Sequence, residues 1–127
     1  MQAYRPTHVA IDLDALRHNY QVLRETMRPE WRLLAVVKAD AYGHGAVPVA
    51  RTLEQAGADL FGVAIVEEGL ELRQAGISRP ILMLGGPWPG QEAVVVEQDL
   101  HVVVFEPEQL QRLEQAARQA GKKCFCH

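Results

Sequence analysis

Short apolar runs alternate with amphipathic stretches along most of this chain. The runs cover residues 33–37, 60–66, 81–84 and 102–105, and a weaker one covers residues 123–126. Most are rich in Val, Ile, Leu or Phe and show little strict alternation with polar residues. Such near-continuous runs are typical of strands that are buried on both faces of a parallel sheet.

A first helix is predicted ahead of these runs. Asp14 can cap it, and an apolar stripe follows at Leu16, Tyr20, Leu23 and Met27. Pro29 then blocks its continuation. The separate apolar run at residues 9–13 precedes this helix, so we expect it to pair outside the repeat that begins at Leu33.

Further helices are predicted between the apolar runs. They cover residues 46–56, closed by Gly57, residues 67–75, closed by Gly76, and a short stretch at 92–97. Pro107 suits the first turn of a last helix, which Gly121 closes. Strands that alternate with helices predict an α/β fold with a parallel sheet.

Two architectures fit this repeat: an open doubly wound sheet, or part of a (β/α)8 TIM-type barrel. A whole barrel takes about 250 residues. The 127 residues of this chain would therefore hold about half of one.

Composition and charge exclude some classes of function for this chain. Hydrophobic residues make up 48% of the chain and charged residues 23%, which is typical of a globular domain. A net charge of −3 argues against general nucleic-acid binding, which needs a dense positive field. No run approaches the roughly 18 apolar residues of a membrane span, so no membrane partner is expected.

The start of the chain and its cysteines bear on localisation. Residues 1–12 show no basic region followed by an apolar run, so no signal peptide is visible. Cys124 and Cys126 form no disulfide framework, which favours a reducing cytoplasm. With His127 they suggest half a metal site at most, and a buried strand end is the more common case, so no metal is expected.

The stretch Ala-Val-Val-Lys-Ala-Asp-Ala-Tyr-Gly-His-Gly at residues 35–45 carries the candidate chemistry. Lys38 ends an apolar strand, at the carboxyl edge where α/β active sites are built. Desolvation by apolar neighbours lowers the pKa of a lysine and frees its amine for Schiff-base chemistry. The Tyr42 hydroxyl can reach a phosphate or a ring oxygen. By position alone, however, such a lysine more often lies on the surface, and such a tyrosine is more often a packed aromatic.

Residues 35–45 resemble the signature by which alanine racemases bind pyridoxal 5'-phosphate (PLP), and the match runs throughout. Three further stretches agree in order and spacing. Residues 9–16 with Asn19 are similar to the opening of that family, residues 68–77 to its second barrel helix, and residues 80–85 to its third barrel strand.

The resemblance implies a role for four residues. Lys38 would bind PLP as an aldimine and act as one of two catalytic bases, and Tyr42 would donate a hydrogen bond to the cofactor phosphate. Val36 and Leu84 would line the cofactor pocket.

Asp40 occupies a variable place in the signature and receives no catalytic role. For Glu67 and Glu68 the sequence predicts only a favourable interaction with a helix dipole.

The resemblance also implies a reaction and an assembly. The family interconverts L- and D-alanine, which supplies D-alanine for cell-wall synthesis, and it works as a cytoplasmic homodimer of a barrel followed by a mostly β domain. Residues 1–127 would be the N-terminal portion of the PLP-binding barrel, and residues 125–127 would begin its next strand. The second half of the barrel and the β domain would be absent.

The second base in the family is a tyrosine of the other subunit, and none of Tyr4, Tyr20 and Tyr42 matches it. We therefore expect this chain alone to be inactive and to associate with itself through unpaired sheet edges. Three alternatives stay open: a serine-type racemase, a PLP-binding barrel protein of the homeostasis type without turnover, and a non-catalytic chain that only associates.

Overall fold

The computed structural model describes residues 6–127, so Tyr4 lies outside the described part. Its sheet has four parallel strands, β1 (Leu34–Val36), β2 (Leu60–Val63), β3 (Ile81–Met83) and β4 (Leu100–Val102). They pair in chain order, β1-β2-β3-β4. A doubly wound sheet reverses its strand order at a switch point. The unbroken order therefore selects the barrel-type repeat from the two predicted architectures.

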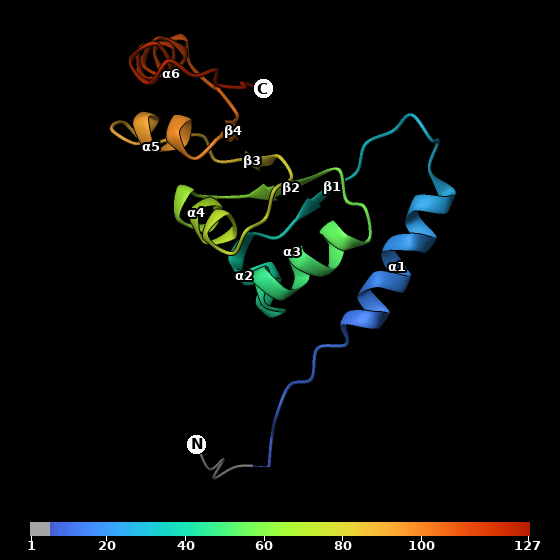
Figure 1. The fold of residues 1–127 in the computed structure, drawn as a ribbon. Helices are drawn as coiled ribbons and strands as arrows, with labels where there is room; N and C mark the ends of the chain where they lie inside the picture. The colour runs from blue at the N-terminus through green and yellow to red at the C-terminus, as the bar shows by residue number, and fades with distance from the viewer. Residues whose placement is uncertain (1–5) are drawn as a thin grey trace.

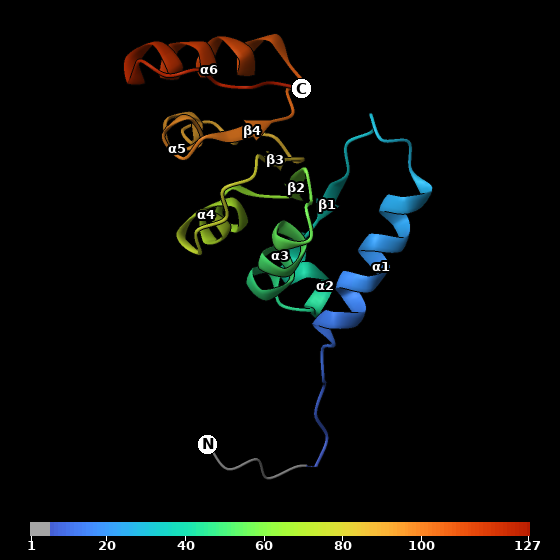
Figure 2. The same cartoon turned by 45° about the vertical axis from the view of Figure 1, so that its right-hand side comes forward.

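Each strand is followed by a helix, as predicted. The helices are α1 (Leu13–Thr26), α2 (Lys38–Gly43), α3 (Ala46–Gln55), α4 (Val66–Gln74), α5 (Glu92–Glu97) and α6 (Pro107–Ala120). Figure 1 and Figure 2 show α3 to α6 along one side of the strands, while α1 stands beside β1 at the other end of the sheet. Residues 6–12 run away from the sheet, and the C-terminus lies at the opposite end of the molecule.

The hydrophobic core lies between the sheet and the helices on that one side. The strand residues that face it are fully buried; they include Phe61, Val63, Ile81, Met83 and Val102. The opposite face is covered less completely at the ends of the sheet. Val36 is 36% exposed there, and His101 is half-buried. Burial on both faces is thus confirmed for β3. Strand β1 is an edge strand, because no segment of residues 6–127 pairs with its outer side.

Two local predictions need correction. The side chain that caps α1 belongs to Asp12 rather than Asp14, because Asp12 Oδ1 accepts hydrogen bonds from the N–H groups of Asp14 and Ala15 at 3.0 and 2.9 Å. The strand expected at residues 102–105 is β4, which begins earlier, at Leu100. Pairing with β3 sets this register, since Ile81 lies opposite Leu100 and Met83 opposite Val102.

The last residues of the chain begin to extend the sheet beyond β4. Cys126 forms a parallel bridge with Val102, and the N–H of Val104 donates to the carbonyl of His127 at 2.9 Å. The expected strand start at residues 125–127 is therefore confirmed. None of the helices in residues 6–127 combines the length and the hydropathy that a membrane span requires.

Arg73, at the end of α4, ties together the loops at the amino edge of the sheet. Its guanidinium donates to four backbone carbonyls at 2.8–3.0 Å, those of Ile77, Arg79, Gln98 and Asp99. These carbonyls precede β3 and β4, so the half-buried side chain of Arg73 holds the loops that lead into both strands.

We expect Arg73→Gln to lower the free energy of unfolding by about 2 kcal/mol, which is the contribution of one or two hydrogen bonds to a charged group. The thermal midpoint of the complete protein, followed by circular dichroism, should fall by several degrees. Arg51→Gln is the matched control, because exposed Arg51 donates to a single carbonyl, that of Ala75. Equal midpoints for the two variants would contradict the role given to Arg73.

Candidate active site

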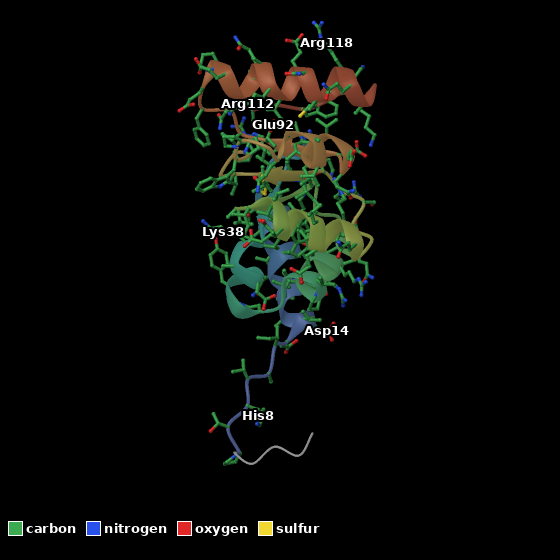
Figure 3. All side chains as sticks on the ribbon, turned by 90° about the vertical axis from the view of Figure 1, so that its left-hand side faces the viewer. His8, Asp14, Lys38, Glu92, Arg112 and Arg118 are labelled. Carbon is green, nitrogen blue, oxygen red and sulfur yellow. The ribbon has the colours of Figure 1, made fainter. Side chains whose placement is uncertain are left out.

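Lys38 lies where the chain leaves the carboxyl end of β1. The N–H of Val37 donates to the carbonyl of Gly62 at 2.8 Å, and Lys38 is the first residue beyond this bond. Its side chain is half-buried. Figure 3 shows it well separated from the Glu92–Arg112 ion pair that joins α5 to α6. The predicted position at the carboxyl edge of a parallel sheet is thus confirmed.

The turn after Lys38 has an unusual backbone. Residues 39–42 all have positive φ, between 50° and 56°, so α2 is one turn of left-handed helix. For L-residues with a side chain this conformation costs about 1–2 kcal/mol each. Strain of this kind persists only where surrounding contacts hold it, and it is concentrated at functional sites.

Local hydrogen bonds account for part of this restraint. The N–H of Ala41 donates to the carbonyl of Val37 at 2.9 Å, and the N–H of Gly45 to the carbonyl of Asp40 at 2.9 Å. Asp40 Oδ1 also accepts from the N–H of Ala46 at 2.7 Å, which ties the turn to the start of α3. Asp40 therefore holds the backbone of the turn.

Glu68 of α4 supplies a hydrogen bond from elsewhere in the sequence. Its Oε1 accepts from the N–H of Ala39 at 2.7 Å, and its Oε2 from the N–H of Ala64 at 2.7 Å. The sequence predicted only a dipole interaction for Glu68. Its contact spans 29 residues and has no local signal in the sequence, so the pairing of β1 with β2 was needed to reveal it.

Val36 and Leu84 lie on either side of Gly62 on the less covered face of the sheet. A Cβ atom at Gly62 would lie 3.4 Å from Val36 Cγ2 and from Leu84 Cδ1, and only 2.8 Å from Leu34 Cδ2. The side chains of Leu34, Val36 and Leu84 thus pack closely over Gly62 and form an apolar surface beside the strand that carries Lys38. Two of the predicted pocket residues are brought together here.

Tyr42 is 61% exposed at the end of the left-handed turn. It lines, together with Val36, a cavity of about 600 Å³ between α1 and the free edge of β1. Lys38 and Leu84 do not line this cavity. Tyr20 also lines it, and its buried hydroxyl finds no hydrogen-bond partner among the described residues. The cavity is therefore a groove along the outer edge of β1, beside Lys38 rather than around it.

The C-terminal thiols lie away from this region, at the other edge of the sheet. Burial and the neighbouring Cys126 raise the pKa of the Cys124 thiol to about 11. The Cys124 thiol is therefore protonated near neutral pH. His127 Nε2 lies 3.4 Å from His101 Nδ1, and burial, followed by His127, lowers the pKa of His101.

Comparison with known proteins places this geometry in a family. The sequence profile of the family described as "Alanine racemase, N-terminal domain" matches residues 11–127. An alanine racemase of Pseudomonas syringae pv. syringae is 57% identical over 113 residues, which are 88% of this chain and 31% of that protein.

Two solved structures are similar in fold over most of the chain. An alanine racemase of Clostridium difficile in complex with cycloserine superposes with a TM-score of 0.93 at 36% identity, covering 99% of this chain and 35% of that one. An alanine racemase of Bartonella henselae with covalently bound pyridoxal phosphate gives a TM-score of 0.80 at 30% identity, covering 91% and 32%. This chain thus spans about a third of the length of the relatives it matches.

Proposed function

The chain belongs to the alanine racemase family, in its N-terminal domain, and from this premise we propose that the complete protein interconverts L- and D-alanine with PLP held at Lys38. The observation that carries the proposal is the place of Lys38. Its amine lies at the carboxyl end of β1, next to the strained turn and to the apolar side chains that pack over Gly62. Residues 1–127 would form the N-terminal portion of the PLP-binding barrel.

The residues present fit PLP. A flat aromatic ring needs an apolar surface, and the side chains of Val36 and Leu84, which pack together over Gly62, offer one. An aldehyde needs a primary amine, which Lys38 supplies, and a phosphate needs donors, of which the exposed Tyr42 hydroxyl is one. A covalently bound cofactor in the related Bartonella henselae structure supports the same assignment.

Bound PLP supplies an electron sink that stabilises negative charge at the α-carbon of an amino acid. Lys38 Nζ would hold the cofactor and, as a free amine, would take or return the α-proton on one face of the substrate. The Tyr42 hydroxyl would donate a hydrogen bond to the cofactor phosphate and so orient the ring. Val36 and Leu84, which pack together over Gly62, would cover one side of the site.

A second base is needed on the opposite face, and we propose that a homodimer supplies it. Apolar side chains follow each of the four strands and are exposed at the same edge of the sheet; they are Tyr42, Ile65, Trp88 and Phe105. An exposed apolar rim of this kind supports a covering part of the assembled protein. The domain after the barrel, from the other subunit, is the proposed cover.

The proposed setting is cytoplasmic, with D-alanine supplied for cell-wall synthesis. A reducing compartment suits the free thiols of Cys124 and Cys126.

Lys38→Ala should abolish both PLP attachment and racemisation in the complete protein, because no other group replaces the amine. Borohydride reduction followed by peptide mass spectrometry should locate PLP on Lys38 in the unaltered protein. Lys123→Ala, at an exposed position near the other edge of the sheet, should keep both properties. Normal alanine turnover by Lys38→Ala would contradict the assignment, and PLP attachment without turnover in the unaltered protein would favour the homeostasis type.

Tyr42→Phe should weaken PLP affinity by roughly 1.5–3 kcal/mol, the worth of a hydrogen bond to a charged group, with a smaller effect on the rate. Fluorescence titration of the apoprotein with PLP measures the affinity. Tyr20→Phe removes a hydroxyl that has no partner among residues 6–127, so it should leave the affinity unchanged. Unchanged affinity with collapsed turnover in Tyr42→Phe would make Tyr42 an acid or base instead.

Residues 1–127 expressed alone should be inactive and should associate, because the free edge of β1 and the groove beside it stay unsatisfied. Sedimentation should show dimers or larger species. Leu34→Lys places a charge on that edge and should shift the chain toward monomer, whereas Val22→Lys, on an exposed part of α1 outside the groove, should not. A compact monomer of the unaltered chain would refute the role of the edge.

A further inference from the structure

We propose that Glu68 is a positioning residue for Lys38, because its carboxylate couples the turn that carries the lysine to the loop that follows β2. The inference rests on the proposed function, since Lys38 must present its amine to PLP. Glu68 itself touches neither cofactor nor substrate in this assignment. It acts on the backbone between Lys38 and Ala39.

The two carboxylate oxygens of Glu68 have different partners. Oε2 accepts from the N–H groups of Ala64 and Ile65 at 2.7 and 3.4 Å, at the start of its own helix α4. Oε1 accepts from the N–H of Ala39 at 2.7 Å. Capping of a helix by a glutamate in its first turn explains the first pair of contacts. It does not explain the contact with Ala39, which belongs to another β/α unit.

The contact with Ala39 bears directly on the direction of Lys38. The N–H of Ala39 belongs to the peptide unit that follows Lys38, so fixing this N–H fixes the ψ angle of Lys38. Among the described residues, it is also the one hydrogen bond that links the left-handed turn to a segment distant in sequence. The other hydrogen bonds of the turn lie within residues 37–46.

Loss of this contact should free the turn without unfolding the protein. Ala39 is exposed, so water can replace the carboxylate as the partner of its N–H. The four positive-φ residues would then be held by local contacts alone, and other backbone conformations would gain population. The amine of Lys38 would reach the cofactor aldehyde in only part of that population.

Three variants of the complete protein separate positioning from capping. Glu68→Gln keeps one acceptor oxygen and replaces the other by an amide NH2, so it cannot accept at both places. Glu68→Asp is one methylene shorter, so it can cap α4 but cannot also reach Ala39. Glu67→Gln is the matched control, since exposed Glu67 loses the same charge in the same helical turn.

Two readouts are followed besides activity. The first is the rate at which PLP added to the apoprotein becomes trapped on Lys38 by borohydride, together with the pH midpoint of the visible band of the bound cofactor. The second is the exchange of the backbone amide of Ala39 with deuterium. Both Glu68 variants should slow the trapping of PLP and speed the exchange of the Ala39 amide, each by about tenfold. This factor corresponds to the lower limit of what one hydrogen bond to a charged group contributes. Both should also shift the pH midpoint.

Glu67→Gln should behave as the unaltered protein in each readout. Equal trapping rates and equal Ala39 exchange for the Glu67 and Glu68 variants would overturn the inference and leave Glu68 as a helix cap. If Glu68→Gln does not fold, Glu68→Asp decides the question in the same way. Failure of the unaltered protein to attach PLP at Lys38 would overturn the proposed function, and the inference with it.

Discussion

Parallel pairing of the strands in chain order is the constraint on which the rest of this structure depends. It places the carboxyl ends of β1 to β4 side by side, so residues that follow different strands meet at one edge. It also commits the helices α3 to α6 to one face, where the core forms (Figure 1). Val36, Gly62 and Leu84 are separated along the chain and become neighbours only through this order.

The same pairing explains why a costly backbone conformation is stable at the candidate site. The left-handed turn at residues 39–42 is unfavourable for residues that carry a side chain. Its local hydrogen bonds are reinforced by Glu68, which reaches Ala39 because β2 lies beside β1. Fold and site are thus connected: a register shift between these strands would move Glu68 away from the turn.

Several features follow from local sequence and were predicted without the tertiary structure. Helices α5 and α6 begin and end where apolar periodicity, Pro107 and Gly121 indicate. Lys38 was recognised from the motif at residues 35–45 and from its place after an apolar run. The sequence predicts Asp14 as the cap of α1, but Asp12 caps it. Local sequence does not separate the two, because both are aspartates near the start of the helix and aspartate is a favoured capping residue.

Residue types close together in the chain are enough to predict the α/β repeat, the family and the lysine. The strand order, the start of β4 at Leu100 and the exposure of β1 follow only from the tertiary structure, because they depend on which strand lies next to which. The same holds for the role of Glu68. A carboxylate at the start of a helix has the same local signal whether it caps that helix or also reaches a neighbouring unit, and only the packing of β1 against β2 distinguishes the two.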